Sequence, residues 1–166
     1  MTKVALRIFS IKLLKITYQI AKLINGKNPR AKTEERKMAN TSVIVIPEGK
    51  ICDYVDGKFR NDTPEEYVRQ TIEKRLVNEH KYLPKQIRIE YTLQLGSRKP
   101  RADIVIFDKD CGEQTQENIK IIIECKKEAV EARNAKDGVE QLKSYMSACP
   151  NCEWGMWTNG RQKEVY

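Results

Sequence analysis

The sequence has little histidine, no regular cysteine spacing and no phosphate-binding loop, and each shortage excludes a class of protein. It contains one histidine and five irregularly spaced cysteines, an odd number that argues against a disulfide framework and favours a reducing compartment such as the cytoplasm. Cys149 and Cys152 form a lone C-x-x-C pair without the two further ligands of a structural zinc site. No G-x-x-x-x-G-K-[ST] motif occurs, so the sequence offers no ATP-driven motor.

The net charge of +8 comes from one end of the chain. Residues 1–37 carry ten Lys or Arg and two Glu, which accounts for the whole excess. Residues 38–166 are balanced, with 21 basic and 21 acidic residues. The balance excludes a uniformly basic nucleic-acid-binding domain, so any contact with nucleic acid must come from local patches.

The basic segment predicts an amphipathic helix over residues 1–25. Its apolar residues recur every three or four positions, at Leu6, Phe9, Leu13, Ile16, Ile20 and Leu23. Lys12 and Lys15 interrupt every window long enough to span a membrane. Three interpretations stay open: a helix packed on the domain or a neighbour, a helix at a membrane surface, which we favour less, or a segment outside a protein that starts at Met38.

We therefore divide the chain into residues 1–37, an amphipathic helix and linker that need not join the folded domain, and residues 38–166, an α/β domain. A helix is expected over 62–80, where Thr63 can cap its first turn. The inward face of that helix is expected to carry Val68, Ile72 and Leu76. The remaining elements are expected as strands at 86–95, 102–107, 119–127 and 153–160, with a helix at 134–148 before the last strand. The order is helix, three-stranded meander, helix and strand, and the second helix implies a parallel crossover.

Charged residues stand where two of these apolar strands begin and end. Asp103 lies at the start of strand 102–107, and Glu124 and Lys126 lie at the end of the next strand. Residues two apart in a strand face the same side, so Glu124 and Lys126 point together. If the two strands are antiparallel neighbours, Asp103 comes close to both, and two carboxylates and an ammonium meet at one edge of the sheet.

Such a group suits a hard divalent cation next to a phosphate. Two close carboxylates repel each other and need a cation, and oxygen ligands without His or Cys favour Mg²⁺, which Mn²⁺ can replace. A neighbouring lysine can orient or help deprotonate a water and stabilise charge on a phosphate. The same residues also fit a plain salt-bridged strand end, and their spacing alone does not choose between the two.

Five motifs follow one another along most of the chain beyond Met38. They are TPEEYVRQ (63–70), RADIVIF (101–107), IIIECKK (121–127), QLKSY (141–145) and TNG (158–160). Together they resemble the N-terminal nuclease domain of type I restriction enzyme R proteins, in the PD-(D/E)xK endonuclease superfamily. The resemblance implies a restriction-endonuclease-like core that hydrolyses DNA phosphodiester bonds with Mg²⁺, and restriction–modification subunits as further partners.

The resemblance also implies roles for matching residues. Asp103 and Glu124 would be metal ligands, and Lys126 would be the catalytic lysine. Glu66 of the first helix would support the metal, with Glu65 as the alternative.

Two further groups complete the predicted site. Gln141 and Tyr145 match a Q-x-x-x-Y motif of this branch, and the resemblance places them in the catalytic set beside the lysine and the DNA backbone. They are four residues apart and so share a helix face, although without the resemblance an exposed helix surface is the favoured explanation of that spacing. Arg98, Lys99 and Arg101 immediately precede Asp103, and we expect them to hold DNA phosphates.

Besides a membrane-surface protein organised by residues 1–25, the sequence leaves two functional classes open. The first is a Mg²⁺-dependent endonuclease that has little sequence preference and no motor of its own. The second is a catalytically inactive nuclease-fold module that binds DNA or docks subunits. The departure at Ala102, where the superfamily often has proline, does not choose between them.

Overall fold

The computed structural model describes residues 45–166. Its elements in chain order are β1 (Lys50–Cys52), β2 (Phe59–Asn61), α3 (Pro64–Asn78), η1 (Pro84–Gln86), β3 (Ile87–Thr92), β4 (Arg101–Phe107), η2 (Gln116–Asn118), β5 (Ile119–Cys125), α4 (Val139–Ser147), β6 (Trp154–Thr158) and β7 (Lys163–Val165). The helix predicted at 1–25 lies outside the described residues, so the division at residue 38 stays a prediction. None of the described helices is long and apolar enough to cross a membrane.

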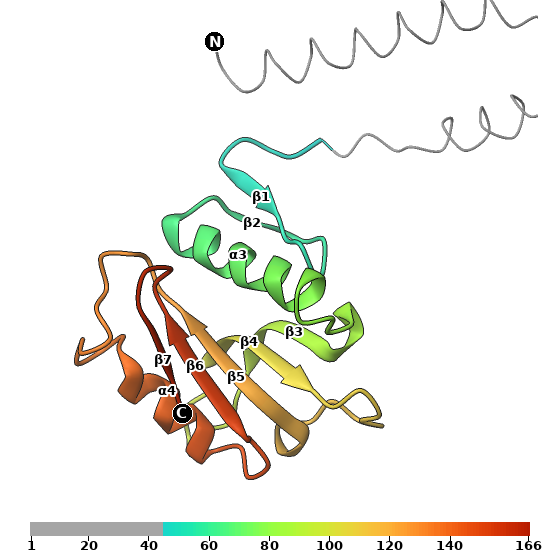
Figure 1. Ribbon diagram of the computed structural model, residues 1–166, viewed down its shortest axis with the longest axis vertical. Coiled ribbons are helices and arrows are strands. Elements are labelled where there is room, and N and C mark those ends of the chain that lie inside the picture. The colour runs from blue at the N-terminus through green and yellow to red at the C-terminus, as the bar shows by residue number, and fades with distance from the viewer. Residues whose placement is uncertain (1–44) are drawn as a thin grey trace, which may run out of the picture. The chain divides into compact units, whose positions relative to one another are not determined.

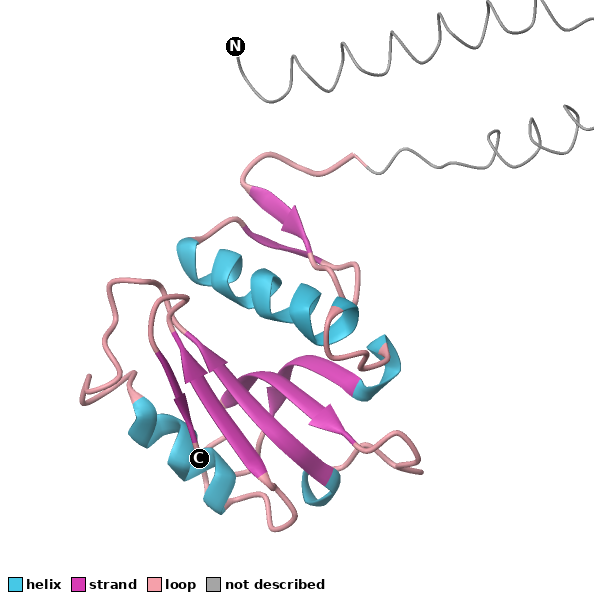
Figure 2. Cartoon of the chain, in the orientation of Figure 1, coloured by secondary structure: helices cyan, strands magenta, loops and turns pink. Residues whose placement is uncertain are grey.

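A five-stranded sheet with the order β3-β4-β5-β6-β7 forms the centre of the domain (Figure 1). The pairs β3–β4 and β4–β5 are antiparallel, and β6 joins β5 in parallel after the α4 connection. β7 then pairs antiparallel with β6, and β1 and β2 form a separate hairpin. The mixed α/β class and the parallel crossover predicted from the sequence are confirmed (Figure 2).

The two helices cover opposite faces of this sheet, as the alternation along β5 shows. Ile122 belongs to a buried cluster with Leu142 of α4, whereas its neighbour Ile123 belongs to a second cluster with Leu76 of α3. Because successive residues of a strand point to opposite faces, α3 and α4 must lie on different sides of β5. The domain therefore has three layers, helix, sheet and helix, with an apolar cluster in each interface.

The N-terminus of α3 forms as the sequence predicts. Pro64 is the first helical residue, and the backbone N–H of Glu66 donates to Thr63 Oγ1 at 3.2 Å. The second helix is shorter than predicted, beginning at Val139 rather than at residue 134. The side chain of Asn134 accepts hydrogen bonds from the backbone N–H groups of Lys136 and Asp137, each at 2.9 Å. Because these bonds stabilise a non-helical turn at this point, the helix begins later.

The predicted inward face of α3 is confirmed, since Leu76 belongs to the buried cluster on the sheet and Val68 and Ile72 pack against it, but the helix also buries residues that the pattern did not predict. Val68 and Ile72 are only half-buried. The buried residues of the helix are mostly polar or charged: Glu66, Arg69, Gln70, Glu73 and Leu76. The hairpin β1–β2 contributes to this burial, since the backbone N–H of Tyr54 donates to Gln70 Oε1 at 3.0 Å. Charged side chains are therefore enclosed on a second side of α3, next to the aliphatic side that the pattern predicted.

Candidate active site

The antiparallel pairing of β4 with β5 brings Asp103 and Glu124 together. Ile104 is paired with Ile123, so the residues that flank this pair are neighbours across the two strands. The backbone N–H of Asp103 donates to Glu124 Oε1 at 3.2 Å, and the N–H of Cys125 donates to Asp103 Oδ2 at 2.7 Å. Each carboxylate is thus held by the backbone of the other strand, and the predicted proximity is found.

Lys126 extends the same group of side chains beyond the end of β5. Its Nζ lies 3.4 Å from Glu124 Oε2 and 3.6 Å from Glu65 Oε1, and its side chain is largely buried. Its backbone N–H donates to the carbonyl of Thr158 at 2.8 Å, so pairing with β6 continues past the strand. The ammonium is thereby fixed between the end of β5 and the first turn of α3.

The electrostatics of this group show an excess of negative charge. Burial raises the pKa of Glu124 to about 8, and the charge of Asp103 adds to the shift while Lys126 opposes it. Burial also raises the pKa of Asp103, against the hydrogen bond from the Cys125 amide. For Lys126, burial acts to lower the pKa, but the attraction of Glu124, Asp103 and Glu65 outweighs it and leaves the pKa raised. A further cation near Asp103 and Glu124 would relieve their repulsion.

A pocket of about 230 Å³ opens beside Asp103. Its wall contains four carboxylates and two guanidiniums together with smaller side chains: Arg60, Asn61, Thr63, Glu65, Glu66, Arg69, Glu90, Asp103 and Cys125. Glu124 and Lys126 are not part of that wall. Acidic side chains outnumber basic ones around this pocket, which suits a cation better than an anion.

The two candidate glutamates of α3 take different places. Glu66 is buried, pairs with Arg69 and accepts a hydrogen bond from Gln70 Nε2 at 2.9 Å. Glu65 is more exposed and faces Lys126. Both line the pocket that contains Asp103, so the structure brings both to the predicted region.

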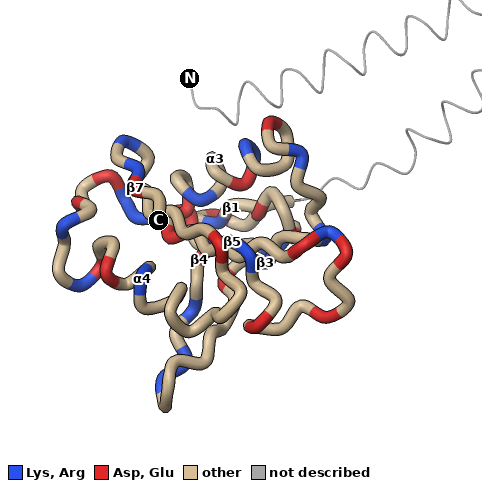
Figure 3. Tube along the Cα trace, turned by 60° about the horizontal axis from the view of Figure 1, so that its bottom comes forward, with Lys and Arg blue, Asp and Glu red and all other residues tan. Residues whose placement is uncertain are grey.

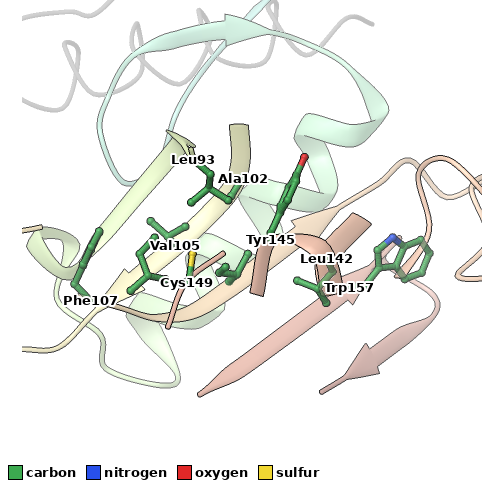
Figure 4. Close-up of a cluster of buried hydrophobic side chains, with 10 residues drawn as sticks. Leu93, Ala102, Val105, Phe107, Leu142, Tyr145, Cys149 and Trp157 are labelled. Atoms are coloured by element: carbon green, nitrogen blue, oxygen red, sulfur yellow. The ribbon is translucent and has the colours of Figure 1, made fainter. Parts of the chain in front are cut away.

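Gln141 and Tyr145 share one face of α4, as their spacing predicts. Gln141 Nε2 donates to the hydroxyl of Tyr145 at 2.7 Å. The ring of Tyr145 is buried in the cluster between α4 and the sheet, and its hydroxyl points away from the neighbouring apolar side chains (Figure 4). An exposed helix surface is therefore the wrong description of this pair. Both residues line a second pocket of about 280 Å³ together with Arg98, apart from the pocket at Asp103.

The basic turn before β4 is exposed at all three predicted DNA contacts. Arg98, Lys99 and Arg101 are each exposed, and Arg101 Nη1 lies 3.3 Å from Glu90 Oε2. Elsewhere along the trace, basic and acidic residues are interspersed (Figure 3). Contact with DNA through these three residues stays a prediction.

Sequence reasoning missed several residues around the site. Arg60, Arg69 and Glu90 line the pocket, but Glu90 reads in the sequence as an ordinary outward-facing position of an alternating strand. Asn159 holds the segment that follows Lys126, since its Nδ2 donates to the carbonyls of Glu128 at 3.1 Å and Val130 at 2.8 Å. The TNG motif gave a signal for this last residue, although not for its structural role.

The donor set fits a metal ion that keeps much of its own shell. Within residues 45–166, no three His, Cys, Asp or Glu side chains are grouped so as to hold a metal ion by themselves. The adjoining carboxylates of Asp103 and Glu124 supply two oxygen-bearing groups. Mg²⁺ is commonly bound through one or two carboxylates, with water and phosphate oxygens completing its octahedron. The oxygen donors of these two carboxylates are therefore compatible with the Mg²⁺ that the sequence predicts.

The family model described as "Type I restriction enzyme R protein N terminus (HSDR_N)" matches residues 64–166. The matched region runs from the first residue of α3 through β7, and so includes every predicted site residue. Comparisons with curated proteins and with solved structures gave no match.

Proposed function

Because the chain belongs to the family of type I restriction enzyme R protein N-terminal domains, we propose that it is a nuclease that hydrolyses DNA phosphodiester bonds with Mg²⁺. In this proposal, α3, the meander β3–β5, α4 and β6 are the restriction-endonuclease-like core. DNA is the substrate, and restriction–modification subunits are the protein partners that the family suggests.

The convergence of Asp103, Glu124 and Lys126 carries the proposal. These residues come from two neighbouring strands, and the contacts that join them are 3.2 and 3.4 Å long. A salt-bridged strand end needs one acid and one base, whereas here a buried carboxylate (Glu124) and a half-buried one (Asp103) are held beside a single lysine. An arrangement that is electrostatically unfavourable on its own is typical of a site that binds a cation.

Each acidic or basic side chain of the site would have its own role in phosphodiester hydrolysis. Asp103 and Glu124 would hold Mg²⁺, which when bound polarises a phosphate oxygen and acidifies a water. Lys126 remains protonated because of the surrounding carboxylates, so it can stabilise negative charge that builds on the phosphate. Glu65 keeps the ammonium directed toward the site, and Glu66 supplies negative charge to the pocket wall.

DNA would be held by side chains outside this centre. Arg98, Lys99 and Arg101 are exposed and can contact backbone phosphates. The hydrogen-bonded pair Gln141 and Tyr145 lines the pocket next to Arg98, where it can position the backbone.

The test is nicking of supercoiled DNA by the full chain in Mg²⁺ or Mn²⁺, repeated with a chelator. We expect cation-dependent nicking that Lys126→Ala removes, while Lys127→Ala, which changes the exposed neighbouring lysine, leaves it intact. Circular dichroism of both variants controls for folding. Nicking that survives Lys126→Ala contradicts the assigned chemistry.

A catalytically inactive DNA-binding or docking module is the second candidate. One observation favours it: both carboxylate oxygens of Glu124 already have partners within the protein, Asp103 N–H and Lys126 Nζ. Cation-dependent binding of DNA without any cleavage, measured in the same buffers, would select this candidate over the nuclease.

A further inference from the structure

Glu90 has a backbone conformation that glutamate rarely adopts. Its φ is 54°, and among the described non-glycine residues only Lys81 also has a positive φ, of 62°. Lys81 lies in the turn after α3, where a left-handed residue is common. Glu90 lies inside β3, where such a conformation is unusual and costs about 1 kcal/mol or more.

The strand changes face at this residue. Ile89 packs in the cluster on the α3 side, whereas Tyr91 packs in the cluster on the α4 side, although residues two apart in a strand normally share a face. The flanking pairs Ile89–Ile104 and Tyr91–Ala102 keep their register. Glu90 and Asp103 thus fall between the same two flanking pairs, where the strand rotates, and both line the pocket.

The rotation alone does not explain a glutamate. Glycine adopts a positive φ without a steric penalty and would make the same change of face. The chain instead has a residue that is strained there, so its side chain must contribute something that glycine lacks.

That side chain joins the pocket to the buried charges of α3. Glu90 Oε1 lies 3.5 Å from Arg69 Nη1, and its Oε2 lies 3.3 Å from Arg101 Nη1. The Arg69 side chain is only 6% exposed and also pairs with Glu66. Glu90, Arg69 and Glu66 thus form one chain of contacts along the wall that faces Asp103.

We propose that Glu90 is a positioning residue of the proposed nuclease site, which holds Arg69 against Glu66 and so fixes the acidic wall opposite Asp103. The inference rests on the proposed function. The strained backbone of Glu90 directs its carboxylate toward the pocket rather than toward either apolar face of the sheet.

Three variants of the full chain test this role. Glu90→Gly keeps the positive φ, relieves the strain and removes the carboxylate, whereas Glu90→Gln keeps the size and the strain and removes the charge. Lys81→Gly relieves the same kind of strain far from the pocket. Two quantities are measured for each variant: the Mn²⁺ concentration that gives half of the cation-induced rise in unfolding temperature, and the rate of nicking.

We expect both Glu90 variants to need about tenfold more Mn²⁺ and to nick about tenfold more slowly, the lower end of the effect of removing a partner that orients a metal ligand. Without cation, Glu90→Gly unfolds at the wild-type temperature or higher. Lys81→Gly should raise the unfolding temperature and leave both other quantities at wild-type values.

Wild-type Mn²⁺ dependence and nicking in both Glu90 variants would overturn the proposal and leave the proposed function intact. If Glu90→Gly fails to fold, Glu90→Gln decides the outcome, because it preserves the backbone and the packing. If the unaltered protein shows neither cation-induced stabilisation nor nicking, the proposed function fails, and this inference falls with it.

Discussion

The two faces of the sheet bury different kinds of side chain. On the α4 face the interior is apolar, with Phe107, Ile122, Leu142 and Trp157 among its members (Figure 4). On the α3 face a smaller apolar cluster around Leu76 and Ile104 adjoins the buried side chains of Glu66, Arg69, Gln70 and Glu73. The first face follows the ordinary rule for a core, and the second departs from it.

The difference indicates that one layer mainly stabilises the fold and the other mainly positions charged side chains. Burying apolar surface stabilises the fold without placing any chemistry. Burying paired charges contributes little to stability and is often less favourable than aliphatic packing. We infer that the α4 layer supplies most of the stability, and that the α3 layer gives up some stability to hold carboxylates around the pocket at Asp103.

The largest expected effect is the loss of nicking when Glu124, a buried carboxylate at the proposed site, is replaced. Glu124→Gln should reduce nicking by about a hundredfold or more, because it removes a proposed metal ligand and its charge from the proposed catalytic centre. It should leave the free energy of unfolding unchanged or raise it, since a neutral amide avoids the cost of burying a charged carboxylate and no longer repels Asp103. Glu153→Gln, at an exposed position that pairs with Lys120, is the matched control. A fall in stability equal to the fall in activity would mean that Glu124 is structural.

A substitution in the apolar cluster under α4 should lower stability and leave nicking unchanged. Leu142→Ala opens a cavity at a fully buried position and should lower the free energy of unfolding by about 3 kcal/mol. Nicking per folded molecule should stay unchanged at a temperature where the variant is folded. Denaturant titration measures the first quantity, and a loss well below 1 kcal/mol would contradict the role given to the α4 layer.

The cost of burying charge on α3 can be measured from the pH dependence of stability, through the buried carboxyl of Glu73. Burial raises the pKa of Glu73 from 4.5 to about 8, so the folded state keeps a proton that the unfolded state releases. The stability that this proton provides is present below pH 4.5 and is lost as the pH rises toward 8.

Glu73→Gln should therefore stabilise the protein increasingly over that range, by at most about 1.4 kcal/mol for each pH unit. Unfolding curves collected at several pH values give the difference from wild type. Glu79→Gln, on an exposed position of the following turn, should show no such trend. A difference that does not grow with pH would show that Glu73 is ionised in the folded state.

The smallest expected effect is a weaker binding of DNA when the exposed Arg101, at the start of β4, is replaced. Arg101→Ala should weaken DNA binding for all sequences alike and reduce the slope of log K against log salt by about 0.9. Arg75→Ala removes an exposed arginine of α3 that pairs with Glu79 and should leave the slope unchanged. Equal slopes for wild type and Arg101→Ala would remove Arg101 from the interface.

The central strands could be predicted because their sequences carry strong local signals. Apolar runs ending in charged residues located β4 and β5, whereas their antiparallel pairing was only assumed from the sequence and is shown by the structure. Asp103, Glu124 and Lys126 came from the same signal. The cap at Thr63 was equally local, since it needs only a hydroxyl next to a helix start.

The rest depends on contacts that no local pattern records. β7 and the strands of the hairpin are three residues long, too short to show an alternation. Val68 and Ile72 of α3 line an open groove toward β6 and β7, while the polar face of the helix is covered by the hairpin. The positive φ of Glu90 arises from the change of face in β3, which depends on how both apolar clusters pack.

A calorimetric titration of the full chain with Mn²⁺ tests the central claim most directly, using wild type, Asp103→Asn and Asp108→Asn. Asp108 is an exposed aspartate just beyond the other end of β4. The account predicts that wild type and Asp108→Asn bind the cation alike and that Asp103→Asn binds it at least about tenfold more weakly. Equal binding by all three proteins would contradict a cation site built on Asp103 and Glu124.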